Sequence, residues 1–487
     1  MSARIDDTDP VARKKVDELI TRSEAIRARA DAVPARLLPT GTFNDTDIAN
    51  ARRIALSHGA SVNYTVESGW LVWDGRRWAE DSKDVRIQAI AKQCMEAIFD
   101  EIREAPERDK MMAHAKRSQS RSSIENAIAL LRSEPGILAE LTDFDADPWL
   151  LNVLNGTLDL RTAELRPHER KDRITKLASI RYDASATCPE WEAFLRRITN
   201  KSEGLYDYLR RFVGYLLTGV TSEQVLHFLF GIGANGKTVF CEVVAALLDE
   251  YAIIVSPEMV MARRHGGIPN DIARLRGARS ALMNETSQGS RFDEAKLKDL
   301  TGGDTLNARF LHREFFNFRP THKLVIRGNH RPAIRGTDEG IWRRLRLLPF
   351  TVQIPEHEQD RRLGEKLRDE LPGILRWAVE GCVEWQRGGL RPPDCVMEAV
   401  RAYREESDTL GRFIGECCEV LPLGDVRSSD FYRLYREFAE RAGERAMPSK
   451  DLPAEMQRRG FEWKRTKSGI LYLGIRLLVA EGERWAD

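Results

Sequence analysis

Residues 231–238 have the sequence GIGANGKT, whose spacing is typical of a loop that binds phosphate groups. The glycines allow the backbone to wrap the phosphates with its N–H groups pointing inward, and the following helix adds its positive N-terminal end. Lys237 is placed to reach the β- and γ-phosphate oxygens, and the Thr238 hydroxyl to bind magnesium. The loop therefore predicts binding of a nucleoside triphosphate with magnesium, and its hydrolysis. The residues expected to contact the nucleotide are Gly231, Gly233, Ala234, Asn235, Gly236, Lys237, Thr238 and Val239.

Hydrolysis also needs an acidic residue at the end of a neighbouring strand, to orient magnesium or polarise the attacking water. The segment SALMNE ends in Glu285, which is the candidate for both tasks. Because the strand ends in Asn284 and Glu285 rather than in two carboxylates, Glu285 must supply most of the acidic function.

A third apolar segment, KLVIRGN, ends in Asn329, whose amide can both donate and accept hydrogen bonds near the γ-phosphate or the water. A cluster of arginines follows. In ring-shaped motors, such an arginine stabilises charge on the γ-phosphate bound to the neighbouring subunit. The candidates are Arg335, Arg343, Arg344 and Arg346.

The elements that must position these residues are visible as apolar runs. VLHFLFG at 225–231 predicts a strand leading into the loop, and KTVFCEVVAALL predicts the amphipathic helix after it. Further strands are expected at 280–284, 323–327 and 345–350, with helices or loops between them. This alternation predicts a parallel α/β sheet, and we assign the ATPase core to residues 221–350.

The flanking segments predict further domains. Residues 1–40 read as a flexible N-terminal segment, and 41–220 as a mixed, mostly helical domain. Within that domain we expect a helix at 47–58, a hairpin at 70–78, helices at 84–102 and 123–131, and a solvated loop or helix end at 113–123.

Residues 351–406 read as a helical lid or connector, followed by three helices and a hairpin in 407–487. Three helices and a hairpin describe a winged helix. Its expected basic wing either contacts duplex phosphates or is a solvated face. The residues of that wing are Arg458, Arg459, Lys464, Arg465 and Lys467.

Composition sets the outer limits. At 487 residues the chain is too long for a single core. Its 76 lysines and arginines nearly balance 75 acidic residues, so attraction for nucleic acid must come from local basic patches. Seven cysteines without a paired CxxC spacing fit a reducing, cytoplasmic compartment, and the sequence has neither a signal core nor a long apolar run. No membrane partner is expected.

GIGANGKT, ALMNE, LTGGD, KLVIRGNHRP and GTDEGIWRRLRLLPF occur in this order and at suitable spacing. In this combination the chain resembles a superfamily 3 helicase, with an AAA+-like core. More narrowly, it is similar to the helicase portion of phage and plasmid primase-helicases, which share their layout with poxvirus relatives. The resemblance covers about residues 45–475.

The resemblance implies a homo-hexameric ring that binds ATP and Mg²⁺ between subunits and moves 3′ to 5′ along single-stranded DNA during replication. It implies that Lys237 and Thr238 bind the triphosphate and magnesium, Glu285 is catalytic and Asn329 is the sensor. Arg343 or Arg344 would be the arginine finger, with Arg335 a weaker candidate.

The same family places a DNA-binding hairpin between the acidic strand and the sensor asparagine. Residues 307–318 occupy that place, with His312 and Arg313 at the expected tip and Arg309 on the first strand. A surface turn with exposed polar residues is the alternative.

Primase-helicases of this family carry a large nucleotidyltransferase domain before the segment that starts here near residue 41. We therefore expect a stand-alone helicase that is encoded by a phage or plasmid and works in the cytosol of the bacterial host. It would act on single-stranded and forked DNA, with priming done by a separate primase. The competing hypothesis is an initiator that melts or marks an origin without processive unwinding, which the Asn at position 284 keeps open. A small-molecule P-loop kinase is disfavoured by the motif order.

Overall fold

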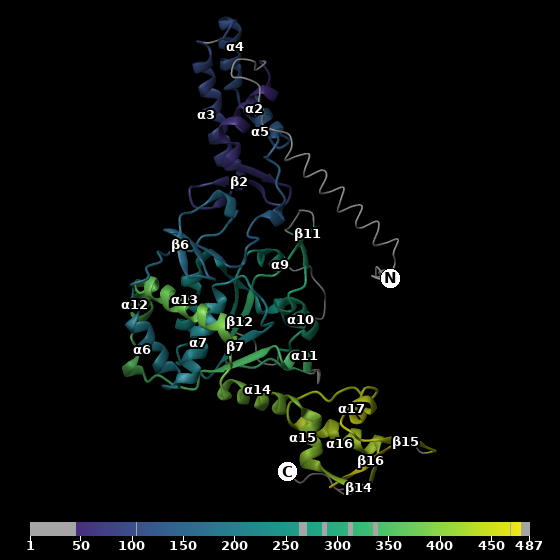
Figure 1. The fold of residues 1–487 in the computed structure, drawn as a ribbon. Coiled ribbons are helices and arrows are strands. Elements are labelled where there is room, and N and C mark those ends of the chain that lie inside the picture. Colours follow the sequence, from purple (N-terminus) through teal and green to yellow (C-terminus); the bar gives the residue numbers. More distant parts are fainter. Residues whose placement is uncertain are drawn as a thin grey trace.

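A computed structural model describes residues 45–478 apart from 104, 263–269, 285–289, 310–314, 335–338 and 468. The described chain forms a helical N-terminal unit, a central body built on a parallel sheet, and a C-terminal domain (Figure 1). None of the helices in these ranges has the length and apolar character needed to cross a membrane.

The N-terminal unit packs helices above a three-stranded antiparallel sheet, as Figure 1 shows. Its first helix begins at the cap residue Thr46, whose side chain accepts a hydrogen bond from the Ala49 N–H. The predicted helix at 47–58 and hairpin at 70–78 are confirmed. The elements are α2 Asp47–His58, β1 Val62–Thr65, β2 Gly69–Trp73, β3 Trp78–Glu80, α3 Val85–Glu101, α4 Arg108–Ser118 and α5 Arg121–Leu131.

The polar stretch at 113–123 contains the end of one helix and the start of the next, as one of the two predicted alternatives has it, but it is not wholly solvated. Helix α4 runs through it to Ser118, and both His114 and Ser118 are buried against α2. His114 and Ser118 face inward because they have hydrogen-bond partners there, which single-sequence polarity does not reveal, whereas most other polar side chains of the stretch are exposed.

A second antiparallel sheet and two helices follow: β4 Leu150–Val153, β5 Gly156–Asp159, β6 Glu164–Arg166, α6 Pro189–Ile198 and α7 Glu203–Leu216. These elements share one hydrophobic core with the helix after the phosphate loop and with α13 Leu371–Gly388, rather than with the N-terminal unit. The core is therefore continuous across residue 220, where the sequence suggested a domain boundary.

The central sheet has the order β13-β7-β12-β9-β8, and all its strands are parallel. The parallel α/β sheet predicted from the apolar runs is thus confirmed. Strand β7 lies between β13 and β12, so the loop that follows β7 lies at the carboxyl end of an interior strand rather than of an edge strand. The strands are β7 Leu226–Phe230, β8 Ala252–Val255, β9 Ser280–Asn284, β12 Lys323–Gly328 and β13 Leu345–Pro349.

The two faces of this sheet pack against different layers. Val325 on β12 belongs to the core that contains α8 Lys237–Leu248, whereas its neighbours Leu324 and Ile326 face the opposite core. That second core includes side chains from four helices and from a hairpin. These elements are α9 Asn270–Arg274, α10 Glu294–Gly302, β10 Leu306–Arg309, β11 Phe315–Phe318, α11 Glu339–Trp342 and α14 Asp394–Ser407.

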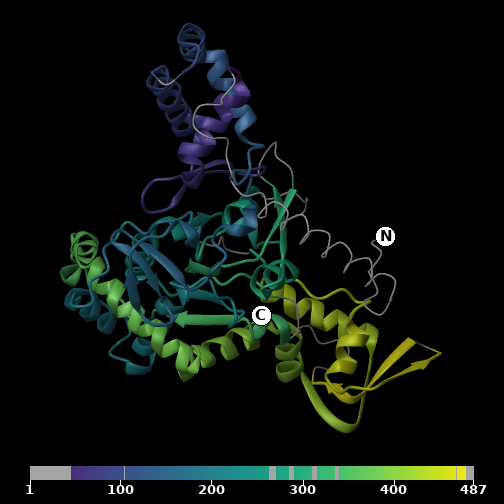
Figure 2. The same ribbon diagram turned by 45° about the horizontal axis from the view of Figure 1, so that its top comes forward.

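Helix α12 Leu363–Asp369 precedes α13, and α14 leads into the C-terminal domain. That domain has its own core, and Figure 2 shows its outer strands projecting away from the body. It consists of α15 Thr409–Cys417, β14 Cys418–Arg427, α16 Ser428–Arg441, α17 Leu452–Arg458, β15 Trp463–Thr466 and β16 Gly469–Leu477, with strand order β14-β16-β15.

The three helices and the hairpin of this domain were predicted, but β14 was not. Its sequence contains Pro422 and Gly424, which normally argue against a strand. The strand tolerates them because its pairing with β16 is irregular between Val420 and Asp425. Assignment of the domain as a winged helix stays a prediction.

Candidate nucleotide site

The phosphate loop connects β7 to α8 in a conformation that two of its glycines make possible. Gly236 has a φ of +82°, and a Cβ there would lie 2.6 Å from Ile198 Cγ2. A Cβ on Gly231 would collide with the carbonyl oxygen of Phe350. Gly233 instead faces open space, with nothing within 4 Å of an added Cβ. Two glycines are thus required by the fold, and the third leaves the loop accessible to a ligand.

Asn235 fixes the loop to the end of β13. Its Nδ2 donates to the carbonyl oxygens of Ile232 at 2.8 Å and Phe350 at 2.9 Å. A second tie comes from the Ile354 N–H, which donates to the Ala234 carbonyl oxygen at 2.8 Å. Asn235 was predicted to contact the nucleotide. Its hydrogen bonds that hold the loop to the end of β13 were not predicted from the sequence.

Lys237 is buried, with 6% of its surface exposed. Its ammonium donates to the Gly231 carbonyl oxygen at 2.6 Å and to Asn235 Oδ1 at 3.0 Å, and both acceptors are neutral. Within the described ranges, no carboxylate forms an ion pair with it. Burial lowers the pKa of Lys237, and the charge of Arg327 lowers it further. An anion entering here would meet an ammonium whose charge is not compensated.

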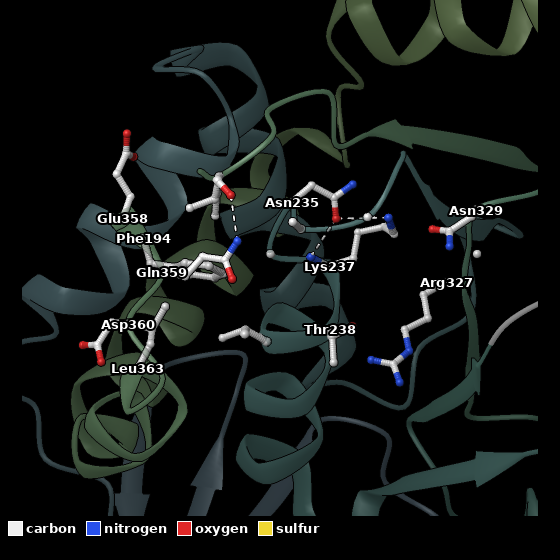
Figure 3. A pocket seen from close by; sticks show the side chains of 16 residues that line it. Phe194, Asn235, Lys237, Thr238, Arg327, Asn329, Glu358, Gln359, Asp360 and Leu363 are labelled. Atoms are coloured by element: carbon white, nitrogen blue, oxygen red, sulfur yellow. Dashed lines mark hydrogen bonds between the residues drawn. The ribbon is translucent and has the colours of Figure 1, made fainter. Parts of the chain in front are cut away.

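A cleft of about 400 Å³ opens beside the loop (Figure 3). Lys237 and Asn329 lie at one end of the view and Gln359 and Leu363 at the other. The first end is cationic and polar, whereas the second combines apolar side chains with one carboxamide and two carboxylates. The lining residues are Phe194, 233–239, 327–329, Ile354, 358–360 and Leu363.

Strand pairing brings Asn329 next to the loop. Strand β12 pairs with β7 through Gly328 and Phe230, so Asn329 emerges beside the start of the loop. Thr238 is exposed in the first turn of α8 and also lines the cleft. The sequence-predicted Lys237, Thr238 and Asn329 therefore lie around one cavity.

Arg327 was not singled out from the sequence, although it lines the same cleft. It shares the side-chain parity of Val325, which packs on the α8 side of the sheet. In register it stands opposite Asn284 of β9. Counting back two residues from Asn329 along the strand would have identified it. Glu285, predicted to be catalytic and to bind metal, lies outside the described residues.

Arg343 and Arg344 occupy different environments although they are adjacent. Arg344 is buried, with 9% exposed, and its guanidinium donates to Thr301 Oγ1 and to the Gly340 carbonyl oxygen, both at 3.1 Å. Arg343 is exposed, and its side chain has no hydrogen bond or ion pair to any described residue. Arg335 lies outside the described ranges.

Both arginines precede β13, whose far end is tied to the phosphate loop. Because a strand rises about 3.3 Å per residue, their backbone lies roughly 20 Å from the loop of their own chain. Neither is placed to serve that site.

The predicted hairpin is present as β10 paired with β11, joined on the surface by a 2.9 Å hydrogen bond between Asn307 and Asn317. The Arg309 guanidinium stacks over the Phe315 ring at 4.8 Å. His312 and Arg313 lie outside the described residues, so their expected place at the tip stays a prediction.

Four of the five residues of the expected basic wing are exposed, and Arg459 is partly buried. Arg459 binds Asp408 at 2.6 Å and Glu455 at 3.1 Å, and Arg458 binds Glu455 at 2.8 Å. Arg459 ties the end of α17 to the start of α15, whereas Arg458 is 66% exposed and pairs with Glu455 within its own helix. The remaining members are Lys464, Arg465 and Lys467, all exposed on or beside β15. In the described part of the chain, no group of three or more His, Cys, Asp or Glu side chains is arranged to hold a metal.

Comparison with known proteins agrees with these motifs. Residues 51–200 match the family described as D5 N terminal like, and residues 229–344 match a family of unknown function (DUF5906). A putative helicase of Acanthamoeba polyphaga mimivirus is 25% identical over 314 residues, covering 58% of this chain and 33% of that protein. A putative helicase of Frog virus 3 is 27% identical over 304 residues, covering 58% and 30%. The chain is a relative of viral putative helicases.

The chain spans about a third of the length of these curated relatives. Among solved structures, the C-terminal region of NrS-1 matches 72% of the chain and covers 89% of its own, at 8% identity and a TM-score of 0.40. The match to the second family begins at residue 229 and ends at residue 344, so it includes both the phosphate loop and the arginine pair.

Proposed function

We propose that the chain is an ATP-dependent DNA helicase that works as a homo-hexameric ring and moves 3′ to 5′ on single-stranded DNA. The observation that supports this best is the buried Lys237 ammonium, which has only neutral acceptors and lies at the start of α8, after the loop that follows the interior strand β7. The similarity to viral putative helicases supports DNA unwinding as the task that this site would serve.

The residues present fit a triphosphate with magnesium. Lys237 would exchange its contacts with Gly231 and Asn235 for phosphate oxygens, and the loop N–H groups would surround the phosphates. The Thr238 hydroxyl makes no hydrogen bond to a described residue and would bind magnesium, with Glu285 in the role predicted for it. Bound magnesium would neutralise charge on the β- and γ-phosphate oxygens.

Asn329 would orient the attacking water from the end of β12. For the arginine finger, we now choose Arg343 over Arg344. Arg344 is held by Thr301 and Gly340, whereas Arg343 is exposed and lies at the edge of the sheet opposite its own loop. This placement suits contact with the γ-phosphate of a neighbouring subunit.

The hairpin formed by β10 and β11 would grip single-stranded DNA inside the ring. Arg309, stacked on Phe315, and the tip residues His312 and Arg313 would contact phosphates and bases. A separate primase and other replication proteins are the further partners we propose, with the C-terminal domain as a winged helix. The site of action would be the cytoplasm.

The test is strand displacement on a forked duplex with a 3′ tail, by the wild type and by Lys237→Ala. We expect ATP-dependent displacement by the wild type, and a loss of hydrolysis of at least about 100-fold in the variant, because the charge that stabilises the transition state is gone. Lys92→Ala, which changes an exposed lysine of α3, is the control for charge removal. Hydrolysis that single-stranded DNA stimulates without any displacement would contradict the helicase proposal.

That contrary outcome would favour the second candidate, an initiator that uses nucleotide to switch its grip on an origin without processive unwinding. The feature in its favour is the end of β9, where Asn284 stands in place of a second carboxylate.

A further inference from the structure

The end of the cleft away from Lys237 is shaped by a short segment after β13. This segment contains Ile354, Gln359 and a 3₁₀ turn, η7 Glu356–Glu358. It is held at both ends: the Ile354 N–H donates to Ala234 of the phosphate loop, and Glu358 binds Arg197 of α6 at 2.8 Å. The segment is therefore positioned relative to the phosphate loop before any nucleotide binds.

Apolar side chains line this end on several sides. Phe194 is buried on α6, Ile354 is half-buried, and Val239 and Leu363 complete the lining from α8 and α12. These side chains offer flat and aliphatic surface to a base, whereas Lys237, Arg327 and Asn329 occupy the phosphate end. The cleft thus has a cationic end that suits phosphates and an opposite end whose apolar surface suits a base.

Gln359 supplies the uncharged polar group at the apolar end, beside the carboxylates of Glu358 and Asp360. Its Nε2 donates to the Ile354 carbonyl oxygen at 2.9 Å, and this bond fixes which way round the carboxamide lies, because a carbonyl oxygen only accepts. Oε1 is left without a described donor. In Figure 3 the carboxamide points from this end of the cleft toward Lys237. A fixed acceptor is therefore presented beside the surface where a base would lie.

We propose that Gln359 is the residue that selects adenine, with its Oε1 accepting a hydrogen bond from the 6-amino group. Adenine carries a donor at this position, whereas guanine and hypoxanthine carry an oxygen acceptor. Two acceptors facing each other cannot form a hydrogen bond, and turning the carboxamide round to present Nε2 instead would break its hydrogen bond to Ile354. The substrate class is then 6-aminopurine nucleoside triphosphates. This inference rests on the proposed nucleotide site and adds its base preference.

The test measures displacement of a fluorescent ATP analogue from the full-length protein by ATP, GTP, ITP and purine riboside triphosphate, which has only hydrogen at position 6. We expect the wild type to bind ATP at least about tenfold more tightly than ITP or GTP, with purine riboside triphosphate in between. Gln359→Met keeps the length of the side chain but removes the acceptor, and should bring the ATP-to-ITP ratio close to one.

Gln359→Lys replaces the acceptor by a donor and should shift the preference toward ITP and GTP. His357→Ala is the matched control, because His357 is exposed on the same 3₁₀ turn but does not line the cleft, and it should keep the wild-type ratio. A Gln359→Met variant with the wild-type ratio, or a wild type without preference, would overturn the assignment of Gln359.

Failure of the proposed function gives a different result. If the protein binds ATP selectively but displaces no strand, the base assignment stands and the helicase proposal falls. If it unwinds DNA equally well with ATP, ITP and GTP, the helicase proposal stands and Gln359 has no selective role. If no nucleotide displaces the analogue, or the analogue does not bind, both fall.

Discussion

The N-terminal unit and the central sheet both bury polar side chains, but those side chains are partnered differently. In the N-terminal unit, Asn50 bonds to Ser118 at 2.9 Å and to His114 at 3.1 Å, and Arg53 forms a 2.7 Å ion pair with Glu101. Beside the central sheet, Lys237 donates to two neutral acceptors and also lines an open cleft. Buried groups that satisfy one another stabilise a fold, whereas buried groups with unused capacity mark a place for a ligand.

The same contrast separates two adjacent arginines. Arg344 is buried, and its guanidinium donates hydrogen bonds to Thr301 and Gly340. It therefore has a structural role, like the buried polar groups of the N-terminal unit. Arg343 is exposed without a described side-chain partner and belongs with Lys237. Experiments that change one member of each class measure whether this division corresponds to function.

The largest effect is expected from Arg343→Ala, which should reduce ATP hydrolysis by at least about 100-fold while leaving the thermal midpoint unchanged. Mixing it with Lys237→Ala provides the sharper test. One variant retains an intact loop and the other an intact arginine, so a mixed ring contains complete sites and hydrolysis should return. Steady-state hydrolysis across mixing ratios measures this. Two inactive variants that stay inactive when mixed would place Arg343 outside a shared site.

Arg344→Ala should act on stability instead. Its removal leaves the Thr301 hydroxyl without this partner and opens a space beside α10, at a cost of about 2 kcal/mol in the free energy of unfolding. Urea denaturation of Arg344→Ala beside Arg343→Ala provides the comparison. Equal stability of the two variants would contradict the division.

Arg53→Ala tests the N-terminal unit. Glu101 is 38% exposed, so solvent weakens the pair, and we expect a loss of only about 1 kcal/mol, confined to this unit. Hydrogen exchange of the α2 and α3 amides should report it, while amides of the central sheet keep their protection. Arg121→Ala removes an exposed pair with Glu125 on α5 and is the control. Loss of protection throughout the central sheet would show that the two regions are not separable.

The smallest effect is expected from pH. Burial lowers the pKa of His114 below its ordinary 6.5, helped by Arg53 and Arg117, while Asp45 and Asp47 oppose the shift. The folded unit therefore binds this proton less readily than the unfolded chain. The stabilisation from the neutral imidazole is present above about pH 6.5 and is lost as the pH falls below it. Exchange of α4 amides between pH 5 and pH 7.5 measures this, and His114→Gln should remove the dependence. An unchanged pH profile in that variant would assign the effect to other groups.

Much of the central sheet was predictable because periodicity and loop chemistry agreed. The strand at 280–284 and the helix at 237–248 have the predicted limits, since each is a continuous apolar or amphipathic run with clear ends. Strand β14 was missed because Pro422 and Gly424 argue against a strand, and only pairing with β16 reveals the irregularity that accommodates them.

The site itself was predictable to the level of its motifs but not of its contacts. Distinguishing Arg343 from Arg344 requires the position of Thr301, which belongs to a distant helix. The role of Gln359 depends likewise on which loop lies opposite, whereas Arg327 could have been found from its alternation with Asn329 along the strand. Side-chain surroundings of this kind arise from tertiary packing, and no local pattern in the sequence encodes them.

Strand β13 connects the two halves of the proposed catalytic arrangement. The strand begins two residues after Arg343. At its other end, the carbonyl oxygen of Phe350 accepts a hydrogen bond from Asn235 in the phosphate loop. In the proposed ring, this strand would transmit displacements between two nucleotide sites. Movement of Arg343 on contact with the neighbouring subunit's nucleotide would displace the phosphate loop at the other end of the strand. Hydrolysis at one subunit interface would then determine when hydrolysis follows at the next.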